Sequence, residues 1–431
     1  MQLHPQRKST FAANLRQLRG RYPRQFWLLF WGTLINVLGV SMIWPFLTIY
    51  MSEKLLLPLT AVAGLISLNS AATLVFSFIA GPVSDRLGRK GLMVGSLLAS
   101  GLTYLMLSQA QTFAAFAALM LLRGATSPLY SVPADAMLAD LVPEEQRPDA
   151  YALLRMSKNL GIAVGPAIGG FITATSYSIS FSLAAVAQAA FGLLILFLAH
   201  ETLPKVAGKL PATASESRPI IRLNLGGYDR ILRDRVFVAF TVGVLFTQIC
   251  AALIWVLMAV YAKQNFALPE SQFGLIATTN AVLVVVFQLA VTQMTKRFPA
   301  YRMLALGALI YAVGTGSVVL ARGFWGFWLS MVIITLGELV LVPTADTHAA
   351  NLAPAEMRGR YLSIYQLSWG AASGIGPVYG GVLNDIFGPP AIWLGGMLSG
   401  LLGASLLNAL GRRTDRASLK PVAEPVEPPA S

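Results

Sequence analysis

The chain has 431 residues, of which 55% are hydrophobic and only 12% are charged. Soluble domains carry roughly 25% charged residues, so this composition excludes a soluble globular fold and indicates a membrane protein. The net charge of +13 would suggest nucleic-acid binding in a soluble protein. The chain has a single cysteine, Cys250, which excludes an internal disulfide.

Apolar windows of about 20 residues, the length that crosses a bilayer, predict twelve membrane-spanning helices. They lie at residues 26–50, 60–80, 92–110, 113–137, 152–173, 178–199, 237–262, 272–294, 301–321, 324–344, 362–383 and 391–411. Because twelve is an even number, both ends of the chain are expected on one side of the membrane.

The basic residues indicate which side that is. Of the 32 Lys and Arg, 26 fall on the side of the termini, three fall on the other side and three lie inside predicted spans. Under the positive-inside rule, this bias predicts that both termini are cytoplasmic, in a multi-pass protein of the inner or plasma membrane. The basic charge is therefore interpreted as a topology signal, and no nucleic-acid partner is expected.

The spans divide into two halves around the longest internal polar connection. The predicted organisation is a basic N-terminus at 1–25, a six-helix bundle at 26–199, a linker at 200–235, a second six-helix bundle at 236–411 and a disordered tail at 412–431. Residues 139–170 align with 350–381 at a constant offset of 211, with shared glycines and prolines. The fold class predicted is an all-α membrane protein whose two bundles form a parallel internal repeat.

The stretch with the most specific pattern follows the second span. It reads Gly81-Pro82-Val83-Ser84-Asp85-Arg86-Leu87-Gly88-Arg89-Lys90. Its glycines and proline favour a sharp turn between two helices. The spacing of Asp85 and Arg89 predicts a charge-assisted hydrogen bond across that turn.

This stretch resembles the loop between the second and third helices of the major facilitator superfamily, G-x-L-x-D-R-x-G-R-K, and departs from it only at Val83. On the fifth span, Gly161-x-x-x-Gly165-Pro166-x-x-Gly169-Gly170 is similar to the motif of the drug:proton antiporter branch, although Ala152 stands where that branch usually has another glycine. The resemblance implies a conformational relay that comprises Gly81, Asp85, Arg86, Gly88, Arg89 and Lys90 together with Asp140 on the fourth span. The alternative is that these charges only anchor the loop at the membrane surface.

Ionisable side chains inside spans cost at least about 2.5 kcal/mol each and need an explanation. Glu338 is the only carboxylate deep within a span of the second half. Burial disfavours its charged form, which makes it a candidate for proton exchange, and some multidrug:proton antiporters carry a similar Gly-Glu pair. A permanent ion pair with a Lys or Arg of another helix is the alternative. Asp135, Asp346 and His348 lie near span ends, where we expect them to reach the interface. Asp135 is also a candidate for the cavity or for proton coupling, as the carboxylate to consider after Glu338.

Three cations also lie inside spans, and Arg155 and Lys158 share one side of the fifth helix. These two are candidates to receive an anionic substrate, and Arg155 alternatively extends to the cytoplasmic surface. The resemblance to the antiporter branch implies that Arg123 influences proton transfer. Neutral candidates for a cavity lining are Asn36, Trp44, Gln248, Asn280, Gln288, Tyr365, Gln366 and Trp369. Gly161, Gly165 and Gly169, with Gly170, are interpreted as a close-packing face, and Pro166 as a bend.

The leading hypothesis is a proton-coupled secondary transporter that exports amphipathic or drug-like compounds by alternating access. No Walker loop, zinc signature or nucleophile elbow is present, so no enzyme activity, metal or cofactor is expected, and the proton gradient is the expected energy source. The expected partners are a small-molecule substrate and the lipid bilayer, with the protein as a monomer. The alternatives are a permease for a sugar or organic anion and, from a different class, a non-transporting receptor or lipid-flipping protein.

Overall fold

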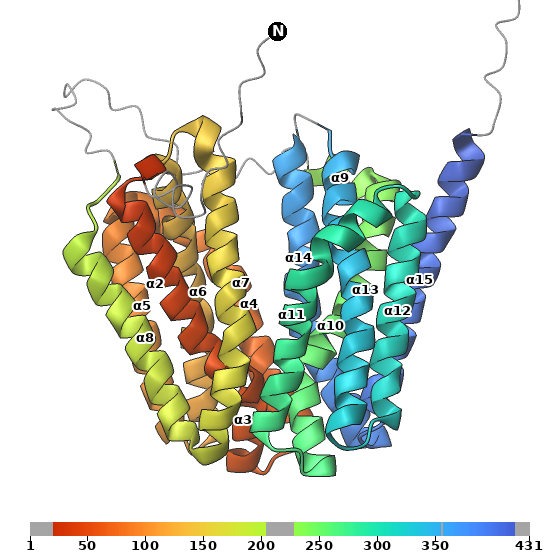
Figure 1. Ribbon diagram of the computed structural model, residues 1–431, viewed down its shortest axis with the longest axis horizontal. Coiled ribbons are helices and arrows are strands. Elements are labelled where there is room, and N and C mark those ends of the chain that lie inside the picture. The colour runs from red at the N-terminus through yellow and green to blue at the C-terminus, as the bar shows by residue number, and fades with distance from the viewer. Residues whose placement is uncertain (1–19, 204–227, 355–356, 419–431) are drawn as a thin grey trace, which may run out of the picture. The chain divides into compact units, whose positions relative to one another are not determined.

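The computed structural model describes residues 20–203, 228–354 and 357–418, and within these ranges the chain forms helices and no strands. Most of the predicted N-terminal segment, linker and tail lie outside the described residues. Figure 1 shows long helices that run side by side within each half of the chain.

In the first half of the chain, the first span consists of two helices separated by a 3-10 turn. The elements of this half are α2 (Arg24–Ile43), the 3-10 turn η1 (Trp44–Phe46), α3 (Leu47–Leu55), α4 (Leu59–Leu87), α5 (Arg89–Gln109), α6 (Phe113–Leu141), the 3-10 turn η2 (Glu144–Gln146), α7 (Arg147–Thr175) and α8 (Tyr177–Leu198). The first predicted span is interrupted at η1 because Pro45 cannot donate the next helical hydrogen bond.

The second half repeats this series. It contains α9 (Tyr228–Arg233), α10 (Arg235–Phe266), α11 (Glu270–Thr295), α12 (Ala300–Ser317), the 3-10 turn η3 (Val318–Leu320), α13 (Gly323–Leu352), α14 (Arg358–Phe387) and α15 (Ala391–Ser418). With α2 and α3 counted as one broken span and the short α9 set aside, the described residues supply the twelve spanning helices of the prediction.

Ten of these helices, among the described residues, are long and apolar enough to cross a membrane on their own composition. The exceptions are α7 and α14, the two glycine-rich helices of the aligned repeat, whose apolar content is diluted by glycines and polar side chains. Most helices extend several residues past the predicted spans, because a hydropathy window detects only the apolar part of a helix.

One of these extensions corrects a prediction. Gly81 and Pro82 do not form a turn, because α4 continues through both residues to Leu87. The turn is made by Gly88 alone, whose φ of 89° is unfavourable for residues with a side chain.

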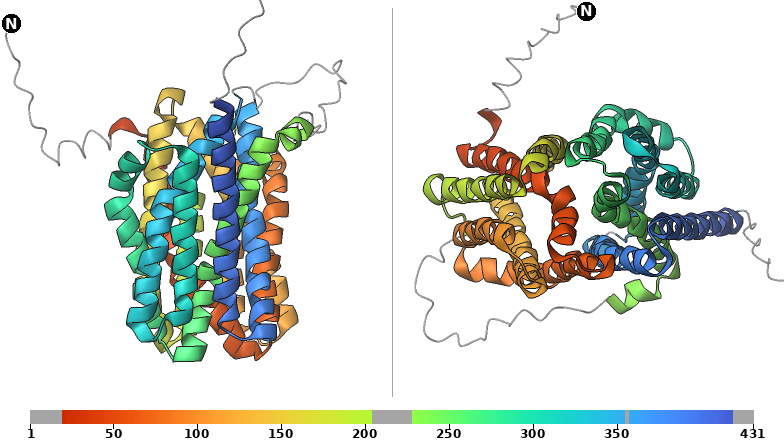
Figure 2. Two further views of the ribbon diagram at one scale, coloured as in Figure 1. Left: turned by 90° about the vertical axis from the view of Figure 1, so that its right-hand side faces the viewer. Right: turned by 90° about the horizontal axis from the view of Figure 1, so that it is seen from below.

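The described chain separates into two compact units that exchange short segments. The first contains residues up to 55, 68–210 and 269–278, and the second contains 56–67, 211–268 and 279 onwards. The start of α4 therefore belongs to the second unit and the start of α11 to the first, whereas the predicted boundaries put each in the other half. Within each unit the helices form a bundle, seen end-on in Figure 2.

The internal repeat explains this exchange. In the second unit, a Cβ on Gly381 of α14 would lie 2.6 Å from the Cα of Thr60, and the Asp385 carboxylate accepts N–H groups of Leu59 and Thr60. In the first unit, a Cβ on Gly170 of α7 would lie 2.5 Å from the Glu270 carbonyl oxygen. The offset of 211 relates Gly170 to Gly381 and Leu59 to Glu270. In both units, therefore, a glycine at the same position of the repeat lies against the backbone at the start of another helix.

Candidate functional site

Polar side chains line a cavity among the membrane-spanning helices of each unit. The cavity of the first unit, which we call the N-cavity, measures about 230 Å³ and is lined by Thr33, Asn36, Val37, Val40, Ser96, Leu97, Ser100, Tyr104, Arg123, Thr126, Ser127, Tyr130, Ser131, Lys158 and Gln188. The C-cavity of the second unit measures about 250 Å³ and is lined by Val244, Thr247, Gln248, Ala251, Trp255, Tyr311, Glu338, Leu341, Val342, Ala345, Asp346, Tyr365, Gln366 and Trp369.

The two cavities occupy equivalent positions in the repeat. At the offset of 211 the lining pairs are Thr33 with Val244, Asn36 with Thr247, Val37 with Gln248, Val40 with Ala251, Ser100 with Tyr311, Ser127 with Glu338, Tyr130 with Leu341, Ser131 with Val342 and Lys158 with Trp369. The same concavity therefore exists twice. Its charge differs, because the N-cavity carries Arg123 and Lys158 whereas the C-cavity carries Glu338 and Asp346.

Glu338 lies on α13 and is half-buried at the wall of the C-cavity. The Asn280 side-chain amide of α11 donates a hydrogen bond of 2.7 Å to its Oε2 and another of 3.0 Å to the Thr335 hydroxyl. No ion pair with Glu338 occurs among the described residues, so the alternative of a permanent Lys or Arg partner is not realised there. Among the described residues, the Glu338 carboxylate therefore has no cation that would hold it permanently ionised.

The rest of the C-cavity is organised by hydroxyl groups. Tyr365 donates to Asp346 Oδ1 at 2.9 Å, and Ser368 donates to Gln248 Oε1 at 2.7 Å. Asp346 was expected at the membrane interface but lines the cavity. Gln366 and Trp369 line it as expected. Gln288 does not, because its amide bonds Thr292 and the Leu339 carbonyl.

Arg123 of α6 is held in the N-cavity by groups from three other elements. Its Nε donates to the Tyr104 hydroxyl and its Nη1 to Asn69 Oδ1, both at 2.9 Å. Its guanidinium lies 4.3 Å from the centre of the Trp44 ring, which is cation–π distance. The sequence singled out Arg123 and Trp44 but did not indicate that they meet.

Lys158 of α7 and Asn36 of α2 also line the N-cavity, as expected. Arg155 and Asp135 are exposed and do not line it, which corrects their placement as cavity candidates. Three residues rotate a helix by about 300°, so the Arg155 side chain points about 60° away from that of Lys158 and lies off the cavity wall. His348 was expected to reach the interface, but it is partly buried between Phe240 and Tyr301.

The glycine face of α7 sets the position of these lining residues. A Cβ on Gly161, Gly165 or Gly169 would lie within 3 Å of atoms of α2. Ser157, next to Lys158, donates to the Phe30 carbonyl of α2 at 2.8 Å. The face was predicted as a packing surface, and here it brings the backbones of two cavity-lining helices into contact. α7 continues through Pro166 as one helix.

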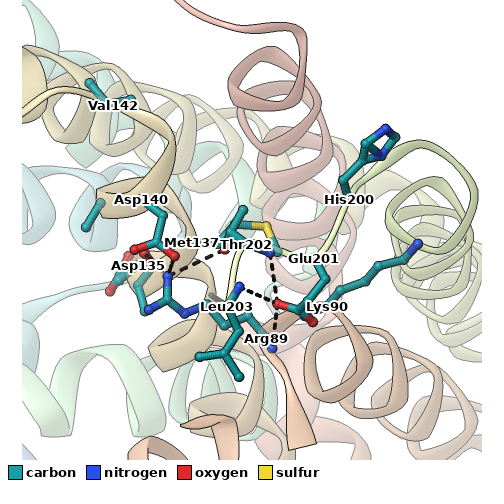
Figure 3. A network of polar contacts seen from close by, with 12 residues as sticks. Arg89, Lys90, Asp135, Met137, Asp140, Val142, His200, Glu201, Thr202 and Leu203 are labelled. Atoms are coloured by element: carbon teal, nitrogen blue, oxygen red, sulfur yellow. Dashed lines mark hydrogen bonds and ion pairs between the residues drawn. The ribbon is translucent and has the colours of Figure 1, made fainter. Parts of the chain in front are cut away.

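Three of the predicted relay residues lie close together where α5 begins and α6 ends, namely Arg89, Lys90 and Asp140 (Figure 3). Arg89 pairs with Asp140 of α6 and donates from Nη1 to the Ala136 carbonyl at 2.8 Å. The expected Asp85–Arg89 bond does not form, because the guanidinium turns toward α6 and Asp85 stays exposed. Arg86, near the end of α4, is exposed, and Lys90, near the start of α5, is partly exposed.

Glu201, just after α8, completes this cluster and was missed from the sequence (Figure 3). Its carboxylate accepts the backbone N–H groups of Arg89, Lys90, Thr202 and Leu203 at 2.9–3.1 Å. Partial burial alone would raise the pKa of Glu201, but these four donors hold the pKa below its ordinary value. A Cβ at Gly88 would lie 2.6 Å from Glu201 Oε2, so this contact also requires glycine there.

Among the described residues, no group of three or more His, Cys, Asp or Glu side chains is arranged to hold a metal ion. The candidate sites are the N-cavity, the C-cavity with a carboxylate that has no ion-pair partner in the described part of the chain, and the charged cluster at helix ends.

The sequence of the chain matches a known protein family and several of its members. The family model described as Major Facilitator Superfamily matches residues 29–254 and 240–430. A "Na(+), Li(+), K(+)/H(+) antiporter" of Planococcus maritimus is 27% identical, with 78% of this chain and 84% of the relative covered. The "Multidrug resistance protein MdtH" of Escherichia coli is 22% identical, with coverages of 90% and 94%.

Solved structures agree on the fold. A POT family transporter in complex with a thioalcohol-conjugated peptide superimposes with a TM-score of 0.70 at 18% identity, covering 92% of this chain and 96% of that one. A bacterial homologue of the lysosomal transporter Spinster, in an inward-facing conformation, gives 0.73 at 12% identity, with coverages of 91% and 97%. At these identities the likeness concerns the fold alone.

Proposed function

The chain belongs to the major facilitator superfamily, a family of membrane transporters and not of enzymes, and from this premise we propose that it is a proton-coupled antiporter that exports small amphipathic compounds. The observation that carries the proposal is Glu338, a cavity carboxylate whose described partner is the neutral amide of Asn280. The named antiporter and multidrug-resistance relatives support exchange and export as the mode of transport.

The mechanism follows from the cost of a charge inside a membrane protein. A protonated Glu338 is neutral and is tolerated in an enclosed cavity, whereas its anion is stable only when water enters or a ligand group compensates it. Loss of the proton from Glu338 to one side of the membrane and binding of the substrate from the other side therefore depend on each other. Alternating exposure of the cavity to the two sides then couples the proton gradient to export.

The cluster around Arg89 is assigned a conformational role. The Arg89–Asp140 pair joins α5 to α6, and Glu201 ties the start of α5 to the end of α8. Both contacts tie helix ends together, so we propose that they set the relative stability of the transport states and do not contact the substrate. The excess of Lys and Arg near both termini supports a cytoplasmic location for them, in the inner membrane.

The proposal is tested by transport into proteoliposomes with an imposed pH gradient. Wild-type protein should accumulate at least one of a panel of amphipathic probes, comprising a cation such as ethidium, an organic anion such as 4-phenylbutyrate and a neutral amide, in response to the gradient. Glu338→Gln keeps the shape of the side chain and mimics its protonated form, so gradient-driven accumulation should be lost while downhill exchange persists.

Asp346→Asn is the matched control, because Asp346 is the other acid of the C-cavity and is already hydrogen-bonded to Tyr365. It should retain gradient-driven accumulation. Accumulation by Glu338→Gln at the wild-type level would overturn the proposal. Gradient-driven movement of Na⁺ or K⁺, with no movement of any organic probe, would replace the substrate class by an alkali cation, as in the Planococcus relative.

A further inference from the structure

The N-cavity contains positive charge that nothing in its lining neutralises. Arg123 and Lys158 line it, and no Asp or Glu does. Asp135 lies close enough to Lys158 for their charges to interact, but they form no ion pair and Asp135 is not part of the cavity wall. A cation inside a membrane span costs at least about 2.5 kcal/mol, so an arrangement that keeps two of them together calls for an anion.

The orientation of Arg123 is fixed without loss of its charge. Its three contacts are the Tyr104 hydroxyl, the Asn69 amide oxygen and the Trp44 ring, all of them neutral. A guanidinium held in this way presents its remaining N–H groups in a defined direction, which suits a planar carboxylate. Lys158 adds a second cation on a flexible stem, exposed to the cavity.

Further polar atoms converge on the same space. Asn36 is only 8% exposed, lines the cavity, and its Oδ1 has no hydrogen-bond partner among the described residues. The hydroxyls of Ser127 and Ser131 line the same wall. A volume of about 230 Å³ is smaller than the roughly 300–1,000 Å³ of whole-ligand pockets, so the cavity fits an anionic head group better than a complete amphipathic molecule.

The repeat shows that this charge is specific to one half. Ser127 stands at the position of Glu338, and Lys158 stands at the position of Trp369. In equivalent cavities, one half therefore has an acid where the other has a hydroxyl, and a cation where the other has an indole. Packing requirements shared by the two repeats do not explain opposite charges.

We propose that the N-cavity is an anion-binding subsite that receives the carboxylate of the transported compound, with Arg123 as its fixed partner and Lys158 as its mobile one. This inference rests on the proposed function, because it treats the cavity as part of the transport path. It names the substrate class as amphipathic carboxylates, in contrast to amphipathic cations.

The test measures binding to the purified full-length protein in detergent, without any gradient and in chloride-free buffer. The probes are 4-phenylbutyrate, its neutral amide and 4-phenylbutylamine, which share one skeleton and differ only in charge. Isothermal titration should show the carboxylate binding at least about tenfold more tightly than the amide, since hydrogen bonds to charged groups are strong. The amine should bind more weakly than the amide.

Lys158→Gln should reduce the preference for the carboxylate over the amide to about threefold or less, because the cation that favours the anion is removed. Arg155→Gln, on the same helix but off the cavity wall, is the matched control and should keep the full preference. Arg123→Lys retains the charge without the planar fork and should give an intermediate preference. If Arg123→Lys fails to fold, Lys158→Gln still decides the question.

Equal binding of all three probes, preference for the amine, or full preference for the carboxylate in Lys158→Gln would each overturn the subsite. The result is independent of Glu338, because binding at equilibrium needs no proton coupling. Failure of gradient-driven transport with carboxylate preference intact would overturn the proposed function only, and the reverse pattern would overturn the subsite only.

Discussion

Gly169→Ala tests the packing that positions the cavity helices. The added Cβ would lie 2.1 Å from the Met42 carbonyl oxygen and 2.5 Å from the Met42 Cα, whereas an ordinary contact begins at 3.4 Å. The obstructing atoms are backbone, so α2 and α7 must separate by roughly 1 Å instead of one side chain rotating away. Overpacking of this kind costs about 1–3 kcal/mol.

Part of that cost is offset by helix propensity, since Gly→Ala inside a helix gains about 0.5–1 kcal/mol. The expected net effect is a loss of about 1 kcal/mol, and of at most about 2.5 kcal/mol, in the free energy of unfolding. Gly95→Ala on α5 is the control, because nothing lies within 4 Å of its Cβ position, and it should be neutral or stabilising. Unfolding midpoints in detergent, followed by tryptophan fluorescence, compare the two variants.

Because Asn36 and Lys158 lie on the two helices that separate, Gly169→Ala should also weaken carboxylate binding in proportion to its instability. The reasoning is refuted if Gly169→Ala is as stable as wild type, or if Gly95→Ala is the less stable variant.

Three further predictions concern the charged cluster and the topology. Glu201→Gln should lower the free energy of unfolding by about 1 kcal/mol at pH 7, because it weakens a helix cap. The pKa of Glu201 in the folded protein lies below its ordinary value, so the difference from wild type should disappear as the pH falls through that pKa. A difference that does not depend on pH would contradict the capping role. Asp140→Asn leaves Arg89 without its counter-ion and should alter spin-label distance distributions between the ends of α6 and α13 while ligand affinity is retained; unchanged distributions would exclude the conformational role. A reporter fused after Lys54 should report the exterior and one fused after Arg416 the cytoplasm, and the opposite result would reverse the orientation.

The sequence predicted the architecture well because its signals are long and redundant. Apolar windows and the bias of Lys and Arg extend over the whole chain, and the 211-residue offset relates its two halves, so errors at single helix ends did not change the fold. The predicted spans 152–173 and 362–383 correspond to α7 and α14, although glycines and polar side chains leave these two helices less apolar than the other ten. The turn was predicted to include Gly81 and Pro82, whereas α4 continues to Leu87 and the turn lies at Gly88. Hydropathy does not mark the end of a helix that continues beyond its apolar part.

The site was predicted less completely, because spacing along one helix does not determine contacts between helices. Glu338 and Lys158 were recognised from the cost of burying charge, and both line a cavity. Asp85 was assigned a bond to Arg89 from spacing alone, whereas Arg89 pairs with Asp140 from another helix. Glu201 carried no local signal, because its role depends on the end of α8 meeting the start of α5.

The divergence between the two cavities was accessible from the sequence but not recognised. Ser127 aligns with Glu338 and Lys158 with Trp369 at the offset that the repeat already supplied. The structure was needed to show that these positions face a cavity, because alignment alone does not distinguish the lining of a cavity from the packed or lipid-facing sides of the same helices.

The most direct test of the central claim is the pH-induced infrared difference spectrum of the full-length protein in lipid. If Glu338 is the group that exchanges protons, the wild-type spectrum should contain a carboxylic-acid carbonyl band that disappears as the pH is raised. That band should be absent in Glu338→Gln and retained in Asp346→Asn. A wild-type spectrum that survives unchanged in Glu338→Gln would show that proton exchange occurs elsewhere and would contradict the account.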